Sequence, residues 1–177
     1  MKRQITVALP AAGIALAVSA ATAVPAAAAT SGSETLSVTL VTSGVSGTRT
    51  VISSVVVAKG VFGGAGKIVE LPDLPTDPPN SSRDDLVFAE GTMHLVSGPG
   101  QITSFSLNPR NCLFRLMLQQ TGKVTGGTGQ FTAATGSFTN TVSGQGLAPR
   151  NPDGSCAIGQ PALHEVDMVA LSGTLSF

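Results

Sequence analysis

The chain has 177 residues, and its ten basic residues balance its ten acidic ones, so its formal net charge is zero. It contains no Trp or Tyr and only seven Phe. A protein without a basic patch and with few aromatic stacking surfaces lacks what nucleic-acid binders use, so nucleic acid is excluded as an expected partner.

The first 29 residues have the pattern of a secretory signal peptide. Lys2 and Arg3 precede an apolar stretch from Ile5 to Ala23, and the small residues 27–29 supply a cleavage site. The alternative, a retained membrane anchor, fits less well because a span needs about 20 uninterrupted apolar residues. We expect cleavage near Ala29, a secreted, extracellular protein with no membrane span after cleavage, and one mature domain over 30–177.

The mature chain alternates apolar and polar residues with a period of two, as half-buried strands do. Leu36, Val38 and Leu40 alternate with Thr and Ser, and the C-terminal residues Val169 and Leu171 begin a similar run. About eight strands are expected, which indicates an all-β barrel or, alternatively, a β-sandwich. Besides the segments around 35–40 and 169–177, the expected strands are 48–58, 60–70, 84–96, 101–107, 114–118 continuing into 123–126, and 130–143.

A proline-rich stretch from Leu71 to Arg83 separates two of these strands and predicts a surface loop. Its Asp73 and Asp77, together with Asp84 and Asp85, suggest calcium as one interpretation. The spacing fits no EF-hand loop, so we expect a solvated acidic loop and no metal.

The two cysteines, Cys112 and Cys156, each follow a turn-forming segment. Export to an oxidising compartment favours a disulfide between them over a free reactive thiol. Such a bond would pin two loops together.

Only a few ionisable residues are candidates for chemistry. Glu90, Thr92 and His94 have the spacing of one strand face, so Glu90 and His94 are weak catalytic candidates if that face lines an interior. The competing interpretation is an outer face, with Val87, Ala89, Met93 and Leu95 inside.

A second polar group precedes the last apolar run. His164, Glu165 and Asp167 are either part of a polar site or, as we favour, an exposed strand start.

The glycine-rich segment 122–138 combines strand formers with glycines at turn positions, and Gly126, Gly127 and Gly129 allow a tight reversal between strands. Gly136 allows a bulge or a close backbone approach. Neither this run nor residues 63–67 has the Gly-Lys-Ser/Thr ending of a phosphate loop, so no cofactor is expected.

Residues Thr125 to Phe131, followed by Ala134 and Gly136, resemble the GGTGxF/Y…AxG hairpin of dirigent and allene oxide cyclase-like barrels, including secreted bacterial proteins with this signature. In that bacterial group an NP-x-x-C turn precedes the hairpin, as residues 108–112 do here, and a second cysteine follows. The resemblance covers roughly 86–177 and implies an antiparallel eight-stranded closed barrel.

Plant members of this superfamily guide radical coupling or cyclise an unsaturated epoxide with polar residues inside the barrel. The histidine–aspartate pair of the dirigent first strand is missing from residues 34–42, so no catalytic residue is carried over.

Three functional hypotheses follow. The barrel binds a small apolar ligand, it is an enzyme of cyclase, isomerase or dirigent type, or it is a structural protein that meets an extracellular partner. We favour binding over catalysis because a fold by itself does not imply an activity.

Overall fold

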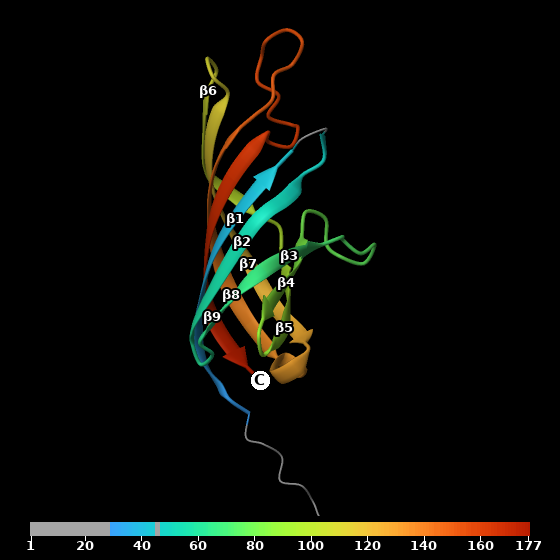
Figure 1. Cartoon of the computed structure of the whole chain (residues 1–177), viewed down its shortest axis with the longest axis vertical. Coiled ribbons are helices and arrows are strands. Elements are labelled where there is room, and N and C mark those ends of the chain that lie inside the picture. Colours follow the sequence, from blue (N-terminus) through green and yellow to red (C-terminus); the bar gives the residue numbers. More distant parts are fainter. Residues whose placement is uncertain (1–28, 45–46) are drawn as a thin grey trace, which may run out of the picture.

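The computed structural model describes residues 29–44 and 47–177. The expected signal peptide and its apolar stretch lie outside these residues. The described chain forms a closed antiparallel β-barrel that is open at one end and capped at the other (Figure 1). The all-β prediction and the eight-stranded closed ring are confirmed, and the sandwich alternative is wrong.

In the described part of the chain, nine strands and the short 3-10 turn η2 are the named elements. In chain order they are β1 (Ser31–Ser43), β2 (Thr50–Gly60), β3 (Gly64–Leu71), β4 (Ser82–Phe88), β5 (Gly91–Ser97), β6 (Gln101–Asn108), β7 (Leu113–Gly127), η2 (Gly129–Phe131), β8 (Thr135–Leu147) and β9 (His164–Ser176).

The ring closes because β7 pairs with two strands along one edge. Its C-terminal half pairs with β5, while its N-terminal half pairs with β6. The order β5-β4-β3-β2-β1-β9-β8-β7 therefore returns to β5, and β6 remains outside the ring. In Figure 1, β6 rises beside β7 at the end opposite the C-terminus.

Two expected strands have different boundaries in the structure. The segment 84–96 is a hairpin of two strands, β4 and β5, because the chain turns at Ala89 and Glu90. The segment 130–143 begins with η2, and its strand starts only at Thr135. Conversely, residues 123–126 continue the preceding strand as expected.

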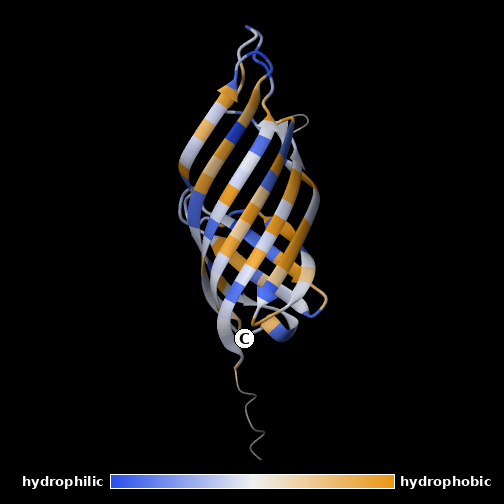
Figure 2. Ribbon diagram, turned by 90° about the vertical axis from the view of Figure 1, so that its left-hand side faces the viewer, coloured by the Kyte–Doolittle hydropathy of each residue, from blue (hydrophilic) through white to orange (hydrophobic). Residues whose placement is uncertain are grey.

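The period-two pattern determines which side chains face the lumen. On β1 the buried residues are Glu34, Leu36, Val38, Leu40 and Thr42, and the residues between them lie outside. Figure 2 shows the resulting alternation of apolar and polar bands along the tilted strands.

One end of the barrel is closed by aromatic packing. Phe131 of η2 is fully buried, and its ring lies 5.1 Å from that of Phe62 and 5.4 Å from that of Phe177. Phe88 completes the cluster at 4.9 Å from Phe62 in an edge-on arrangement. Aromatic pairs in this geometry are favourable beyond their area of burial.

The disulfide lies at the other end and confirms the predicted pairing. Cys112, in the β6–β7 turn, and Cys156, in the loop between β8 and β9, are bonded with a Cα–Cα distance of 5.4 Å. The amide of Ala148 also donates to the Cys112 carbonyl at 3.0 Å. The two loops are therefore held together beside the open end.

Candidate binding cavity of the barrel

The lumen contains a cavity of about 410 Å³ beneath the open end. Nine Val, Leu and Ile side chains and eleven polar or charged residues line it, and they come from seven of the eight ring strands and the adjoining segments. The apolar lining residues are Val38, Leu40, Ile68, Leu86, Leu95, Leu118, Val142, Val169 and Leu171. A cavity of this size lies within the range of small-molecule sites, about 300–1,000 Å³.

Arg49 is the centre of an ion-pair network at the mouth of this cavity. Its guanidinium pairs with Glu70 of β3, lies 3.5 Å from an Asp167 carboxylate oxygen and 4.0 Å from one of Glu165. Burial by itself would lower the pKa of Arg49, but the hydrogen bond and charge of Glu70, with Asp167 and Glu165, raise it. Burial raises the pKa of both Glu165 and Asp167, and their neighbouring carboxylates raise it further.

Asp84 is a second lumen carboxyl, next to this network. It lies directly across the ladder from Glu70, so two acidic side chains share one face of adjacent strands. Burial raises the pKa of Asp84 to about 6, and the charge of Glu70 adds to the effect. The hydroxyl of Ser82 donates to Asp84 at 3.4 Å.

The most buried polar residues that line the cavity are Asn140 on β8 and Ser97 on β5, each 1% exposed. Asn140 Nδ2 donates to Ser97 Oγ at 3.2 Å. Asn140 Oδ1 has no hydrogen-bond partner among the described residues. Because buried polar atoms are nearly always hydrogen-bonded, this acceptor marks a place in the cavity wall where a partner is expected.

A second apolar cleft of about 300 Å³ continues from the mouth toward the disulfide-linked loops, and Arg49 and Glu165 line its lower part. Phe105, Phe114 and Leu116 form one wall, while Ile158 and Pro161 contribute to the other. The lumen therefore opens into an apolar vestibule rather than directly onto a polar surface.

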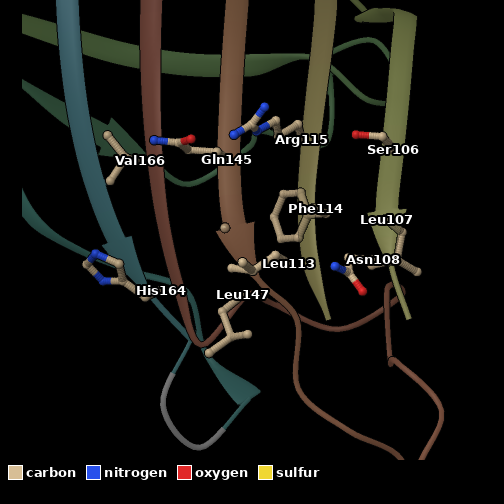
Figure 3. A pocket seen from close by; sticks show the side chains of 11 residues that line it. Ser106, Leu107, Asn108, Leu113, Phe114, Arg115, Gln145, Leu147, His164 and Val166 are labelled. Carbon is tan, nitrogen blue, oxygen red and sulfur yellow. The ribbon is translucent and has the colours of Figure 1, made fainter. Parts of the chain in front are cut away.

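A larger hollow, of about 600 Å³, lies on the outer face of β6 to β9 (Figure 3). Arg115, Gln145 and Val166 form a row across three paired strands there, with Leu147 and His164 in the next row. The lining of this hollow holds no buried unpartnered polar atom among the described residues. The lumen is therefore the better candidate site.

The catalytic candidates Glu90 and His94 do not meet in the lumen. Glu90 is exposed in the β4–β5 turn, and His94 lies outside, with its Nδ1 2.6 Å from Asp85 Oδ1. Met93 and Leu95 are the buried residues of β5. The outer-face interpretation is therefore right for β5. It is wrong for Val87 and Ala89, because the turn at Ala89 and Glu90 changes the parity and Leu86 and Phe88 are the buried residues of β4.

The glycine-rich hairpin is placed against the same β4–β5 turn. A Cβ on Gly127 would lie 2.0 Å from the Thr92 carbonyl oxygen, and one on Gly129 would lie 2.3 Å from that of Glu90. Gly129 also has a φ of 59°. Gln130 donates its amide to the Glu90 carbonyl at 3.2 Å. Glu90 thus contributes to docking of the hairpin through its backbone.

The other two hairpin glycines differ in what they permit. Gly126 has a φ of 118°, which L side chains rarely adopt. A Cβ on Gly136 would lie 2.4 Å from the Thr174 carbonyl oxygen, so glycine there allows a close backbone approach between β8 and β9.

The expectation for the start of β9 is partly wrong. His164 is exposed, but Asp167 is only 8% exposed and faces the lumen with Arg49. The reason is register, because Asp167 has the same parity as Val169 and Leu171, whose side chains line the cavity.

The four aspartates considered for calcium do not converge. Asp73 and Asp77 belong to the β3–β4 loop, Asp84 faces the lumen, and Asp85 pairs with His94 outside. No cluster of three or more His, Cys, Asp or Glu suited to a metal occurs among residues 29–44 and 47–177.

Sequence reasoning missed Arg49, Glu70, Asp84 and Asn140 as lumen residues. A signal was present for two of them: Asp84 has the parity of Leu86 and Phe88, and Asn140 lies between Phe138 and Val142 on the same face. No local pattern indicates that Arg49, which precedes β2, turns into the barrel.

Comparison of the chain with protein-family models, curated proteins and solved structures found no significant match. The resemblance to allene oxide cyclase-like and dirigent barrels therefore stays a prediction that depends on the hairpin and the cysteine spacing. No helix in the described part of the chain has the length and apolar character needed to cross a membrane.

Proposed function

We propose that the protein binds a small, largely apolar molecule inside the barrel. The observation that carries this proposal is the coincidence of an apolar cavity of about 410 Å³ with Asn140 Oδ1, a buried acceptor that has no partner. Buried acceptors are nearly always hydrogen-bonded, and this one belongs to a residue that lines the cavity. A bound molecule with a hydrogen-bond donor would satisfy it.

The proposal includes action outside the cell, which depends on the expected signal peptide of residues 1–29. The disulfide between Cys112 and Cys156 is compatible with an oxidising compartment. An extracellular partner protein is the alternative to a small ligand, and a lumen that takes up no apolar probe would favour it.

The test is a titration with the apolar dye N-phenyl-1-naphthylamine, whose fluorescence rises on leaving water. The absence of Trp and Tyr keeps protein emission from overlapping the signal. We expect saturable binding at one site and displacement by n-octanol. Binding should be lost in Val142→Phe, which adds an aromatic ring to the cavity wall.

The matched control is Thr141→Phe, which places the same ring on the outer face of β8 one residue away. Circular dichroism establishes that both variants fold. Equal dye binding by the two variants would place the dye outside the barrel and contradict the proposal.

A second candidate, an isomerase- or cyclase-type reaction in the same cavity, is favoured by one observation. Asp84, with a pKa of about 6, lies across from Glu70 and can exchange a proton near neutral pH. Native mass spectrometry of wild type and Asp84→Asn secreted by the same host would separate the two functions. Different bound masses would indicate turnover, and identical masses would indicate binding alone.

A further inference from the structure

We propose that the cavity selects a protonated amine: the ligand carries an ammonium group that lies among the lumen carboxylates and an apolar body that contacts the leucine and valine walls. This inference rests on the proposed function, because it specifies the class of molecule that the same cavity binds.

The charge of the lining is the first argument. Four carboxylates, Glu70, Asp73, Asp84 and Asp167, line the cavity against two guanidinium groups, Arg49 and Arg83. Both guanidinium groups are already paired. Arg49 interacts with Glu70 and Asp167, and the Nε of Arg83 lies 3.7 Å from Asp77 Oδ2. The cavity therefore has surplus negative charge and no arginine free to receive an anionic ligand.

Two of the four lining carboxylates, Asp73 and Asp84, have no salt bridge among the described residues; Asp73 lies in the exposed β3–β4 loop, whereas Asp84 lies on β4. The charge of Arg49 acts on Asp84 less strongly than the like charge of Glu70, and the Asp84 side chain receives a hydrogen bond from Ser82 alone. Its nearest cross-strand neighbour is Glu70, which carries the same charge. An ammonium placed beside Asp84 would convert this like-charge contact into an attractive one.

Asn140 gives the second, independent argument. Its unpartnered Oδ1 is an acceptor, as are the carboxylate oxygens that line the same cavity from other strands. A ligand that matches these groups must bring hydrogen-bond donors. An alkylammonium has three donors and no acceptor, whereas a fatty acid anion brings acceptors only.

The experiment compares three probes with one apolar body and different head groups: octylamine, n-octanol and octanoate. Isothermal titration calorimetry at neutral pH, below the concentrations at which these molecules aggregate, measures each affinity for the full mature protein. We expect octylamine to bind about tenfold or more tighter than n-octanol, because it gains a hydrogen bond to a charged group, and octanoate to bind weakest.

A matched pair of variants assigns the effect to the lumen. Asp84→Asn and Asp85→Asn remove the same charge at adjacent positions, one facing the cavity and one facing His94 outside. Asp84→Asn should lower the affinity for octylamine about tenfold and change the affinity for n-octanol by no more than about twofold. Asp85→Asn should change neither affinity.

The possible outcomes separate this inference from the proposed function. Binding of n-octanol without preference for octylamine, or an equal loss of octylamine in both variants, overturns the amine selectivity and leaves the binding function intact. Failure of all three probes to bind overturns both.

Discussion

The two ends of this barrel are stabilised by different chemistry. At the closed end, the rings of Phe62, Phe88, Phe131 and Phe177 pack against one another with centroids 4.9–6.4 Å apart. At the open end, Arg49, Glu70 and Asp167 form ion pairs, and large apolar residues such as Phe105 and Ile158 are 47% and 60% exposed.

Each end also contains one buried polar side chain without a full set of partners, and these differ in what surrounds them. Glu34 Oε2 at the closed end accepts the Phe62 amide at 2.9 Å, so its carboxyl holds the β2–β3 turn. Asn140 Oδ1 faces a cavity instead. The two side chains therefore differ in surroundings: Glu34 lies in a packed region, and Asn140 lines a cavity.

The largest effect should come from removing the centre of the closed end. Phe131→Ala should lower the free energy of unfolding by about 3–5 kcal/mol, because it leaves a cavity among three other rings. The measurement is urea unfolding followed by far-ultraviolet circular dichroism.

Phe105→Ala is the control at the open end. This ring is 47% exposed and stacks on Phe114 with their centroids 6.5 Å apart. Its removal should therefore lower the free energy of unfolding by about 1 kcal/mol or less. Similar losses in the two variants would contradict the contrast between the ends.

The disulfide should be next in magnitude, since it compensates for weak packing beside the open end. Replacing Cys112 and Cys156 together with Ala should cost up to about 4 kcal/mol in the chain-entropy model, for a separation of 44 residues. The same unfolding measurement checks it. An unchanged unfolding midpoint in the double variant would mean that hydrogen bonds such as that from Ala148 to Cys112 already hold these loops.

Glu34 tests whether the closed-end carboxyl has a structural role. Glu34→Ala should cost about 2–3 kcal/mol, because it leaves the Phe62 amide without an acceptor and opens a cavity. Glu34→Gln keeps a side-chain oxygen for that amide and should retain most of the stability. A loss in the Gln variant as large as in the Ala variant would show that the charge, rather than the acceptor, matters.

The smallest expected effect concerns the pH dependence of stability at the open end. The pKa of Asp84 is raised in the folded protein to about 6, so its ionised form disfavours folding. The protonated form of Asp84 therefore stabilises the folded state. This stabilisation is complete below the unfolded-state pKa, about 3.9, and is lost as the pH rises through about 6. The charged groups that influence the pKa of Asp84 are Glu70, Arg49 and Asp85.

Comparing wild type with Asp84→Asn isolates this contribution. The wild-type protein should gain about 1 kcal/mol relative to the variant when the pH falls from neutral to about 5. Chemical unfolding at both pH values measures the difference. A constant difference between the two proteins would mean that Asp84 does not titrate in this range.

Sequence reasoning predicted the strands well where alternation was regular. β1 and the C-terminal half of β9 have the expected inward residues, and the disulfide was expected from two cysteines in a chain predicted to be exported. It failed at 84–96 because Ala89 and Glu90 carry no turn signal such as Pro or Asn-Gly. At this turn Gly91 has a φ of 147°, and Thr128 and Gln130 of the glycine-rich segment hydrogen-bond to Thr92 and Glu90, which are 36 or more positions away.

The candidate site was only partly accessible to the same reasoning. Parity alone assigns Asp84, Asn140 and Asp167 to apolar faces, but a polar residue at the start of an apolar run also fits an exposed strand end. Whether such a residue faces the lumen or lies at an exposed strand end depends on where the barrel wall ends. The sequence of a single strand does not contain this information.

The sequence by itself determined the all-β class, the inward face of the regular strands and the cysteine pairing, because period-two burial and export chemistry act locally. Tertiary structure decided the rest. Closure of β7 onto β5 brings β3, β4, β8 and β9 around one lumen, and only then do Arg49, Glu70, Asp84, Asn140 and Asp167 meet. These residues come from segments distant in sequence, so the parity of one strand can place a single residue on its inner face but cannot show that the five residues line one cavity.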